Sequence, residues 1–313
     1  MPVKLLKEWN VEEVDAAVAL SRDGTIALVV SGMKNGIDCV EVPNGAKTQS
    51  LQGHTATVTA LAIAPDCRYG ASGDENGEVR LWELSTGKPV GVLHGHSKRI
   101  ASLAYSPNGR ILLSGSWDNT SRSWDVQTIK SVSTFQGHSA GVTGVAISPD
   151  GKTAATSSFD CCVRIWEMAT GKCQRQLPSQ QSKLICVSIS GNGKRLIAGD
   201  AKGCLGVSDW PATHAKIVGP LPAAVGSVRL SNDGTKAYLG LSGGGFWSYD
   251  LKTQNAKQLF ELTGRFPAQL PFGLDFAMSE DARYVVATRA ASAAIIELER
   301  PGSRFSWFGR RSS

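Results

Sequence analysis

Residues 240–244 have the spacing of a hydrolase nucleophile. They match the pattern G-x-S-x-G, in which a serine on a strand-to-helix turn acts with an acid and a histidine that follow it in the chain. In this sequence no histidine follows His214, and strand-like apolar runs lie on both sides of the segment. We therefore expect a glycine-rich turn between two strands and no nucleophile at Ser242.

A second segment resembles the end of a phosphate-binding loop. Gly151-Lys152-Thr153 has the right order of residues, but Ala146 stands where the loop needs its first glycine. The chain also lacks the zinc-protease, EF-hand and dinucleotide-binding patterns. We predict no catalytic residue, no cofactor and no enzymatic activity.

The cysteines form neither a metal-binding nor a disulfide pattern. They are odd in number and irregularly spaced, and none occurs as C-x-x-C. We expect free thiols in a reducing compartment and no metal site. The seven are Cys39, Cys67, Cys161, Cys162, Cys173, Cys186 and Cys204.

The composition indicates a folded protein without a membrane span. The 313 residues are 42% hydrophobic and 19% charged, with 34 glycines and a net charge of +6. That apolar content is too high for a disordered chain, and no apolar run approaches the ~18 residues of a membrane helix. The first residues lack the apolar segment of a secretory signal. We expect a cytoplasmic protein, with the nucleus as the alternative.

The positions of these residues follow from an internal repeat. Gly-His pairs begin at residues 53, 95 and 137 and Trp-acid pairs at 82, 124 and 166, both at a spacing of 42. Between them lies a polar turn that recurs with Asp or Asn in its third place. Its copies start at residues 21, 64, 106, 148, 190, 231 and 279. Apolar runs around each turn predict strands of about five residues.

A period of about 40–45 residues with Gly-His and Trp-Asp marks is typical of four-stranded propeller blades, and on these residues the chain resembles the WD-repeat family. The resemblance implies an all-β fold: a seven-bladed WD-repeat β-propeller, each blade a four-stranded antiparallel sheet. It assigns residues 1–300 to the propeller and 301–313 to a C-terminal tail. Such rings usually close by joining the termini in one blade, so we expect Val3–Trp9 to complete the blade of residues 272–299.

In WD-repeat proteins a His, a Ser or Thr, an Asp and a Trp form a buried hydrogen-bonded network in each blade, and each needs the others to stay satisfied. Matching by position assigns three such structural sets. They are His54, Ser72, Asn76 and Trp82 in blade 2, His96, Ser114, Asp118 and Trp124 in blade 3, and His138, Thr156, Asp160 and Trp166 in blade 4. Asn76 in place of an acid weakens its set.

Blades 1, 5, 6 and 7 lack this set. Cys39, Ser208 and Glu297 fall near the tryptophan position, and Tyr249 fits it in part. We expect these blades to be held by apolar packing and backbone ladders.

The resemblance also indicates a partner-binding face. In WD-repeat proteins, peptide-binding side chains often lie just before the conserved Asp and a few residues after the Gly-His histidine. Trp117 and Phe159 hold the first position on adjacent blades, and Arg99 lies between them, so an aromatic pocket with a cationic edge is expected. The alternative is that both rings pack between blades. The candidate partner-binding residues are Trp117, Phe159, Arg99, Lys98, Glu75 and Thr57, with Gly141 at the matching place in blade 4.

The tail from Ser303 onward is basic and aromatic. It is interpreted either as a docking segment or as an unstructured solubilising tail, and Arg310-Arg311-Ser312 resembles a basophilic kinase target. The other basic residues are scattered and form no nucleic-acid module. Direct nucleic-acid binding is therefore not favoured, although association with an RNA–protein assembly stays open.

These observations predict a non-catalytic protein-interaction scaffold, a WD-repeat subunit or adaptor of a multiprotein complex, whose partners are proteins or peptide segments. One alternative is a reader of peptide tails on the same face. Another is an enzyme or small-ligand binder that uses the central channel, which convergent acids or histidines in the channel lining would favour.

Overall fold

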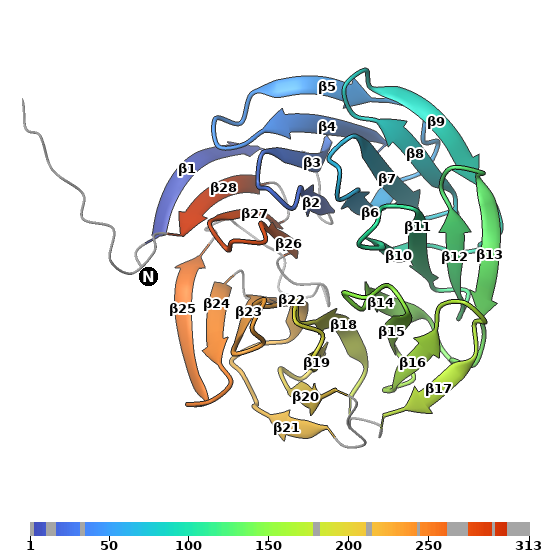
Figure 1. Cartoon of the computed structure of the whole chain (residues 1–313). Coiled ribbons are helices and arrows are strands. Elements are labelled where there is room, and N and C mark those ends of the chain that lie inside the picture. Colours follow the sequence, from blue (N-terminus) through green and yellow to red (C-terminus); the bar gives the residue numbers. More distant parts are fainter. Residues whose placement is uncertain are drawn as a thin grey trace, which may run out of the picture.

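The computed structural model describes residues 3–10, 17–31, 35–177, 182–210, 215–242, 245–261, 275–289 and 292–298. The regular structure in these ranges is entirely β, and its strands form seven four-stranded antiparallel sheets. The sheets stand around a common centre as the blades of a ring (Figure 1). The all-β, seven-bladed propeller predicted from the repeats is confirmed. Within the described ranges, no helix has the length and apolar character to span a membrane.

Blades 1 to 4 follow one another along the chain, and each adds its strands from the centre of the ring outward (Figure 1). Blade 1 contains β2 (Val18–Leu20), β3 (Ile26–Ser31), β4 (Gly36–Glu41) and β5 (Lys47–Leu51). Blade 2 contains β6 (Val58–Ile63), β7 (Tyr69–Asp74), β8 (Val79–Glu83) and β9 (Lys88–Leu93). Blade 3 contains β10 (Ile100–Tyr105), β11 (Ile111–Ser116), β12 (Ser121–Asp125) and β13 (Lys130–Phe135). Blade 4 contains β14 (Val142–Ile147), β15 (Thr153–Ser158), β16 (Val163–Glu167) and β17 (Cys173–Gln176).

Blades 5 and 6 keep this order, and blade 7 joins the two ends of the described chain. Blade 5 contains β18 (Leu184–Ile189), β19 (Arg195–Asp200), β20 (Leu205–Asp209) and β21 (Lys216–Val218). Blade 6 contains β22 (Val225–Leu230), β23 (Lys236–Leu241), β24 (Gly245–Asp250) and β25 (Asn255–Glu261). Blade 7 contains β26 (Asp275–Met278), β27 (Tyr284–Arg289), β28 (Ser292–Leu298) and, as its outer strand, β1 (Val3–Asn10).

The ring is closed by β1, which pairs antiparallel with β28 from Val3 opposite Leu298 to Asn10 opposite Ser292. The outermost strand of the last blade thus comes from the start of the chain, as the position of Val3–Trp9 in the repeat predicts. Because closure leaves no blade without a neighbour, it removes the exposed edges of an open array.

The turn after each innermost strand is stabilised by its own polar residues. In blade 3 the Ser106 hydroxyl donates to Asn108 Oδ1 over 2.7 Å, and Gly109 adopts a φ of 70°. Five of the seven turns have glycine at that left-handed place, which glycine adopts without strain. In the other two, Cys67 and Ala282 are forced to φ values of 59° and 55°.

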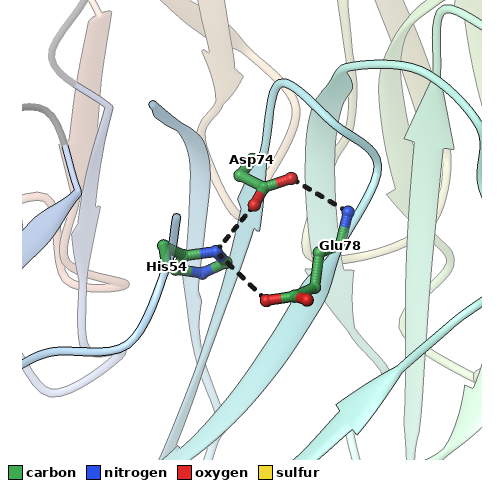
Figure 2. Close-up of side chains that lie close together, drawn as sticks. All are labelled: His54, Asp74 and Glu78. Carbon is green, nitrogen blue, oxygen red and sulfur yellow. Dashed lines mark hydrogen bonds and ion pairs between the residues drawn. The ribbon is translucent and has the colours of Figure 1, made fainter. Parts of the chain in front are cut away.

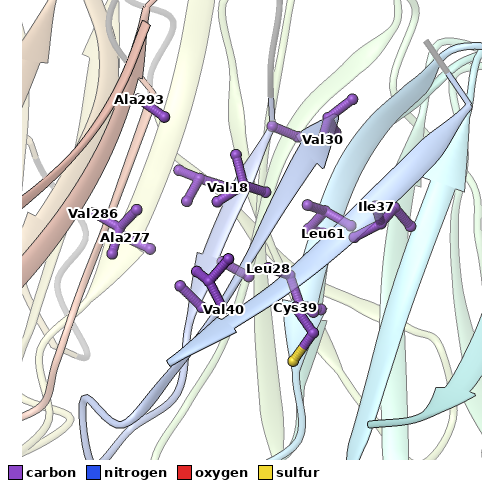
Figure 3. Close-up of a cluster of buried hydrophobic side chains, with 14 of the residues drawn as sticks. Val18, Leu28, Val30, Ile37, Cys39, Val40, Leu61, Ala277, Val286 and Ala293 are labelled. Carbon is purple, nitrogen blue, oxygen red and sulfur yellow. The ribbon is translucent and has the colours of Figure 1, made fainter. Parts of the chain in front are cut away.

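Apolar packing between blades forms the core. One cluster joins blades 7, 1 and 2, where Val18, Leu28 and Val40 of blade 1 lie between Val286 and Leu61 (Figure 3). Leu28 and Val286 are completely buried. At ~25 cal/mol per Å² of buried apolar surface, such clusters are the main stabilising contribution in blades without a polar network.

The strand register shows what replaces the network elsewhere. The tryptophan position, defined by the pairs Gly70–Trp82, Leu112–Trp124 and Ala154–Trp166, is held in blades 1 and 7 by Val40 and Ile296. These are direct neighbours of Cys39 and Glu297, which the sequence places near this position. Blades 5 and 6 hold Ser208 and Tyr249 there. Buried apolar residues take the place of the network hydroxyl in these four blades: Val29, Ala198, Leu239 and Ala287.

Candidate functional site

Equivalent backbone hydrogen bonds position the predicted partner-binding residues on one face of the ring. In blades 2 to 4 the residue after the second strand donates its N–H to a carbonyl just before the first strand. The pairs are Glu75 to Thr57, Trp117 to Arg99 and Phe159 to Gly141, each at 3.0 Å. The two predicted positions are therefore direct neighbours, because a hydrogen bond joins them within each blade.

The side chains at these positions form a continuous row across blades 2 to 5. The Trp117 and Phe159 rings lie 5.7 Å apart at 58°, a favourable tilted contact. Arg99 lies with its Cζ 5.2 Å from the Trp117 centroid and bonds Glu75 at 3.2 Å. We call Glu75, Arg99, Trp117, Phe159 and Lys183 the aromatic row. Trp117 and Phe159 are partly exposed, so the rings pack on each other and still present surface.

Lys183 is a member of the row that sequence reasoning missed. Its Nζ lies 5.6 Å from the Phe159 ring centroid, a cation–π contact. Its carbonyl accepts the N–H of Ala201 at 3.0 Å, which makes Lys183 the blade-5 equivalent of Arg99. Blade 5 has no Gly-His pair from which to count to this position, although the turn register reaches it.

The remaining predicted residues support the row without extending it. A Cβ on Gly141 would lie 3.2 Å from both Cα and Cδ1 of Trp117, so glycine lets the indole approach the chain closely. Lys98 is exposed beside Arg99, and its carbonyl accepts the Ser116 hydroxyl at 2.8 Å. Thr57 contributes its carbonyl, as described above.

Blades 3 and 4 contain complete polar networks. In blade 3, His96 contacts Asp118 through Nδ1 at 2.7 Å and Ser114 through Nε2 at 2.8 Å, and Trp124 Nε1 donates to Ser114 Oγ at 2.8 Å. Blade 4 repeats the arrangement, with distances from 2.7 to 2.8 Å among His138, Asp160, Thr156 and Trp166.

These networks place acid, histidine and hydroxyl in the order of a hydrolase triad. Their environment argues against that chemistry. Ser114 and Thr156 are fully buried, and each hydroxyl already accepts the N–H of an indole. With no access for a substrate, the sets act as internal links within a blade.

In blade 2 the acid of the network is Asp74, and the assignment of Asn76 was wrong. Asp74 Oδ2 lies 3.0 Å from His54 Nδ1, while its Oδ1 accepts the N–H of Asn76 at 3.0 Å. Ser72 completes the set, 2.6 Å from His54 Nε2 and 2.7 Å from Trp82 Nε1. The acid comes two residues early, where blades 3 and 4 have serine, so this blade has a full charge-assisted link.

His54, Asp74 and Glu78 also form a cluster of possible metal ligands (Figure 2). Their ligand atoms lie within 4.8 Å of one another, with His54 Nδ1 3.8 Å from Glu78 Oε1. The short contact to Asp74 uses the Nδ1 proton, and Asp74 Oδ1 accepts the Glu78 N–H at 2.9 Å. The donor set is therefore committed to hydrogen bonds, and we assign no metal to it.

Burial affects the protonation of the network histidine of blade 4. It lowers the pKa of His138, which favours the neutral ring that donates from Nδ1. Burial alone would raise the pKa of Asp160, but the hydrogen bonds from His138, Cys162 and Ser139 outweigh it and lower that pKa. An ionised acid facing a neutral imidazole fits the donor and acceptor roles above.

Two opposite charges lie on neighbouring innermost strands, Arg229 on β22 and Asp275 on β26. Burial raises the pKa of Asp275 to about 6, and the N–H of Val18 and the charge of Arg229 oppose the rise. Desolvation by the surrounding protein lowers the pKa of Arg229, although this residue keeps exposed surface. One acid and one base do not form the cluster of acids or histidines that would favour catalysis in the channel.

The other chemical candidates lie in turns. Ser242 follows β23 and its N–H donates to the Ala224 carbonyl at 2.9 Å, with a strand on each side of the segment. Gly151 lies in the turn between β14 and β15, as expected. All seven cysteines are free thiols. His214, Gly243, Gly244 and the tail of residues 301–313 lie outside the described residues.

Part of the chain matches a known repeat family. The model of the WD domain, G-beta repeat, matches residues 45–83, 87–125 and 129–167. These ranges take in strands of blades 1 to 4, including all three polar networks.

Curated relatives match over shorter segments. The chain is 31% identical over 81 residues to mouse (Mus musculus) THO complex subunit 6 homolog, which is 26% of this chain and 23% of that protein. The human (Homo sapiens) THO complex subunit 6 matches to the same extent. Ribosome biogenesis protein ERB1 of Debaryomyces hansenii is 48% identical over 40 residues, 13% of this chain and 5% of its own length. The chain thus spans less than a quarter of the relatives it matches.

Proposed function

We propose that this chain, which contains three WD-domain repeats and folds as a seven-bladed β-propeller, serves as a non-catalytic scaffold, a subunit or adaptor that holds other proteins in a complex. The observation that carries the proposal is the aromatic row. Aromatic and arginine side chains are the usual anchors of protein interfaces. They stand here on loops at the ends of rigid strands, where binding residues concentrate.

The order of groups along the row suggests what it binds. Arg99 and Lys183 lie at opposite ends of the Trp117–Phe159 pair. Glu75 neutralises part of the charge of Arg99, while Lys183 is exposed. We infer that the partner is a peptide or loop whose apolar residue covers the rings and whose acidic residue meets Lys183.

The relatives support membership of a complex. Two are named as subunits of the THO complex and a third as a ribosome biogenesis protein. We propose that this chain likewise works within an assembly, with an RNA–protein assembly as a specific candidate. Its location in the cytoplasm, or alternatively the nucleus, stays a prediction.

The proposed site is tested by selecting, from a library of displayed random peptides, those that bind the purified chain. We expect selected peptides to combine an apolar residue with acidic ones and to lose at least tenfold in affinity for the double variant Trp117→Ala/Phe159→Ala. The matched control is Val132→Ala, which truncates an apolar side chain of blade 3 that is 50% exposed on the outer strand. Micromolar binding of peptides with a free end would favour the alternative of a peptide-tail reader.

Charge variants separate binding from packing. Lys183→Glu should weaken the binding of acidic peptides. It should leave the thermal unfolding temperature unchanged, because an exposed lysine adds little stability. If Trp117→Ala/Phe159→Ala unfolds the propeller and the Lys183→Glu variant binds the peptides normally, the two aromatic side chains serve packing and the proposed site is wrong.

A further inference from the structure

Blade 5 has lost the side chain that fills the space between blades elsewhere. Ser208 pairs with Leu196 on the neighbouring strand, in the same register in which Trp166 pairs with Ala154. It therefore occupies the tryptophan position of its blade. The nearest tryptophan is Trp210, two residues further along, which is partly buried and packs against the apolar cluster of Ile165, Leu177 and Leu196 without closing the space.

In blade 4 the tryptophan position is filled by an indole that reaches the preceding blade. The Trp166 ring is 1% exposed and lies 5.7 Å from Phe135, the last residue of the outer strand β13 of blade 3. Leu177 is the equivalent of Phe135 in blade 4, because its N–H bonds the Val163 carbonyl at 2.9 Å. In blade 5, however, the residue that faces Leu177 is a serine.

A cavity of about 260 Å³ lies at this place, between blades 4 and 5. Its apolar floor is formed by Ile165, Leu177 and Leu196, with Ser208 and Trp210 beside them. An apolar cavity of about 150 Å³ is enough to hold a benzene molecule. The space therefore accommodates an aromatic side chain together with part of its backbone.

The cavity lies on the face opposite to the aromatic row. Strand β15 begins at Thr153, which lines the cavity, and ends at Ser158, directly before Phe159. The two places are at opposite ends of one strand, so a partner at one leaves the other open.

The cavity opening favours a negatively charged ligand. Lys152 and Arg175 stand there with two acids, Asp150 and Asp209. Asp209 bonds Arg195 at 2.7 Å, and Arg195 is not among the residues that line the cavity. With Arg195 beside the opening, three cations, Lys152, Arg175 and Arg195, stand against the two acids Asp150 and Asp209.

The chemistry of the floor selects the kind of ring. Trp166 donates its indole N–H to Thr156 at 2.8 Å, but the equivalent residue in blade 5 is Ala198. A buried indole N–H without an acceptor costs about 1–3 kcal/mol. A phenyl ring has no such donor and fits an apolar floor without that cost.

We propose that the cavity between blades 4 and 5 is a second docking site, which takes a phenylalanine side chain of a partner protein with a carboxylate beside it in the partner's sequence. The scaffold then has binding sites on both faces and can hold two partners at once. This site does not depend on the aromatic row, so each proposal can fail alone.

The probe is a short acetylated and amidated peptide, Gly-Glu-Phe-Glu-Gly. Its binding is measured by changes in the NMR chemical shifts of the protein as the peptide is added up to millimolar concentration. The control peptide replaces its phenylalanine with alanine. We expect the first peptide to bind the full chain and the second to bind at least tenfold more weakly. Absence of binding by the first peptide, or equal binding by both, overturns the proposal.

Filling the cavity from inside is the decisive variant. Ser208→Trp restores the side chain of blades 2 to 4 and should reduce peptide binding at least tenfold, whereas Ser208→Ala keeps the cavity and should bind normally. If Ser208→Trp does not fold, Ser208→Leu fills less space and makes the same test. Lys152→Glu should weaken binding, and Trp117→Ala/Phe159→Ala should not alter it. Unchanged binding in the filled variants would place the peptide elsewhere and refute the site.

Discussion

Two buried serines of blade 3 give opposite predictions for the same substitution. Ser114 is completely buried and holds two hydrogen bonds of 2.8 Å, to His96 Nε2 and from Trp124 Nε1. Ser121 is 1% exposed, and its Oγ has no hydrogen-bond partner among the described residues. The structure therefore separates a hydroxyl that links a network from one that is buried without a link.

The magnitudes follow from the groups left behind. Ser114→Ala leaves an indole N–H and an imidazole nitrogen buried and unpaired, at about 1–3 kcal/mol each. The free energy of unfolding should fall by roughly 2–6 kcal/mol. Ser121→Ala removes an unsatisfied hydroxyl, and the equivalent residues in blades 2 and 4 are Val79 and Val163. This change should be neutral or stabilising by up to ~1 kcal/mol.

Urea denaturation of the two variants and the unchanged chain measures both effects. The midpoint should fall for Ser114→Ala and hold or rise for Ser121→Ala, with the same slope in each curve. Equal losses in the two variants would refute the reasoning, because burial alone and not hydrogen bonding would then set the cost.

Three further predictions concern stability. Asp74→Asn should lower the urea midpoint, while Asn76→Ala should leave it nearly unchanged. A lower midpoint for Asn76→Ala than for Asp74→Asn would show that Asn76, and not Asp74, belongs to the network. Cys67→Gly should raise the midpoint slightly, since relief of a left-handed strain of about 1–2 kcal/mol exceeds the entropy cost of glycine, and a lowered midpoint would contradict this. The lowered pKa values of His138 and Asp160 mean that the unfolded chain binds more protons, so the unfolding free energy should decrease as the pH falls below about 6.5 and further below about 4. Urea midpoints that do not change across this range would contradict that prediction.

The repeat made the fold predictable, because a period with fixed turn residues specifies each hairpin separately. The position of Asp74 was not predictable in the same way. Alignment places Asn76 in the acid position, but a side chain two residues earlier reaches the same imidazole because it also caps the turn. The contact between acid and histidine is therefore preserved, although the acid comes from a different position of the repeat.

Side-chain packing between blades limited the prediction of sites. Trp117, Phe159 and Arg99 were found from their place in the repeat, whereas Lys183 belongs to a blade without the Gly-His mark. The cavity beside Ser208 depends on what the next blade presents. A serine in a tryptophan position is visible in the sequence, but only the packed structure tells whether neighbours have filled the space.

Affinity purification with mass spectrometry on three forms of the chain tests the central claim most directly: the unchanged chain, Trp117→Ala/Phe159→Ala and the control Val132→Ala. Our account predicts partners that the unchanged chain and the control share and that the double variant loses while it stays folded by circular dichroism; a partner held at the cavity between blades 4 and 5 should remain. The same partners with all three forms would contradict the aromatic row as the binding site. No partners with any form would contradict the scaffold itself.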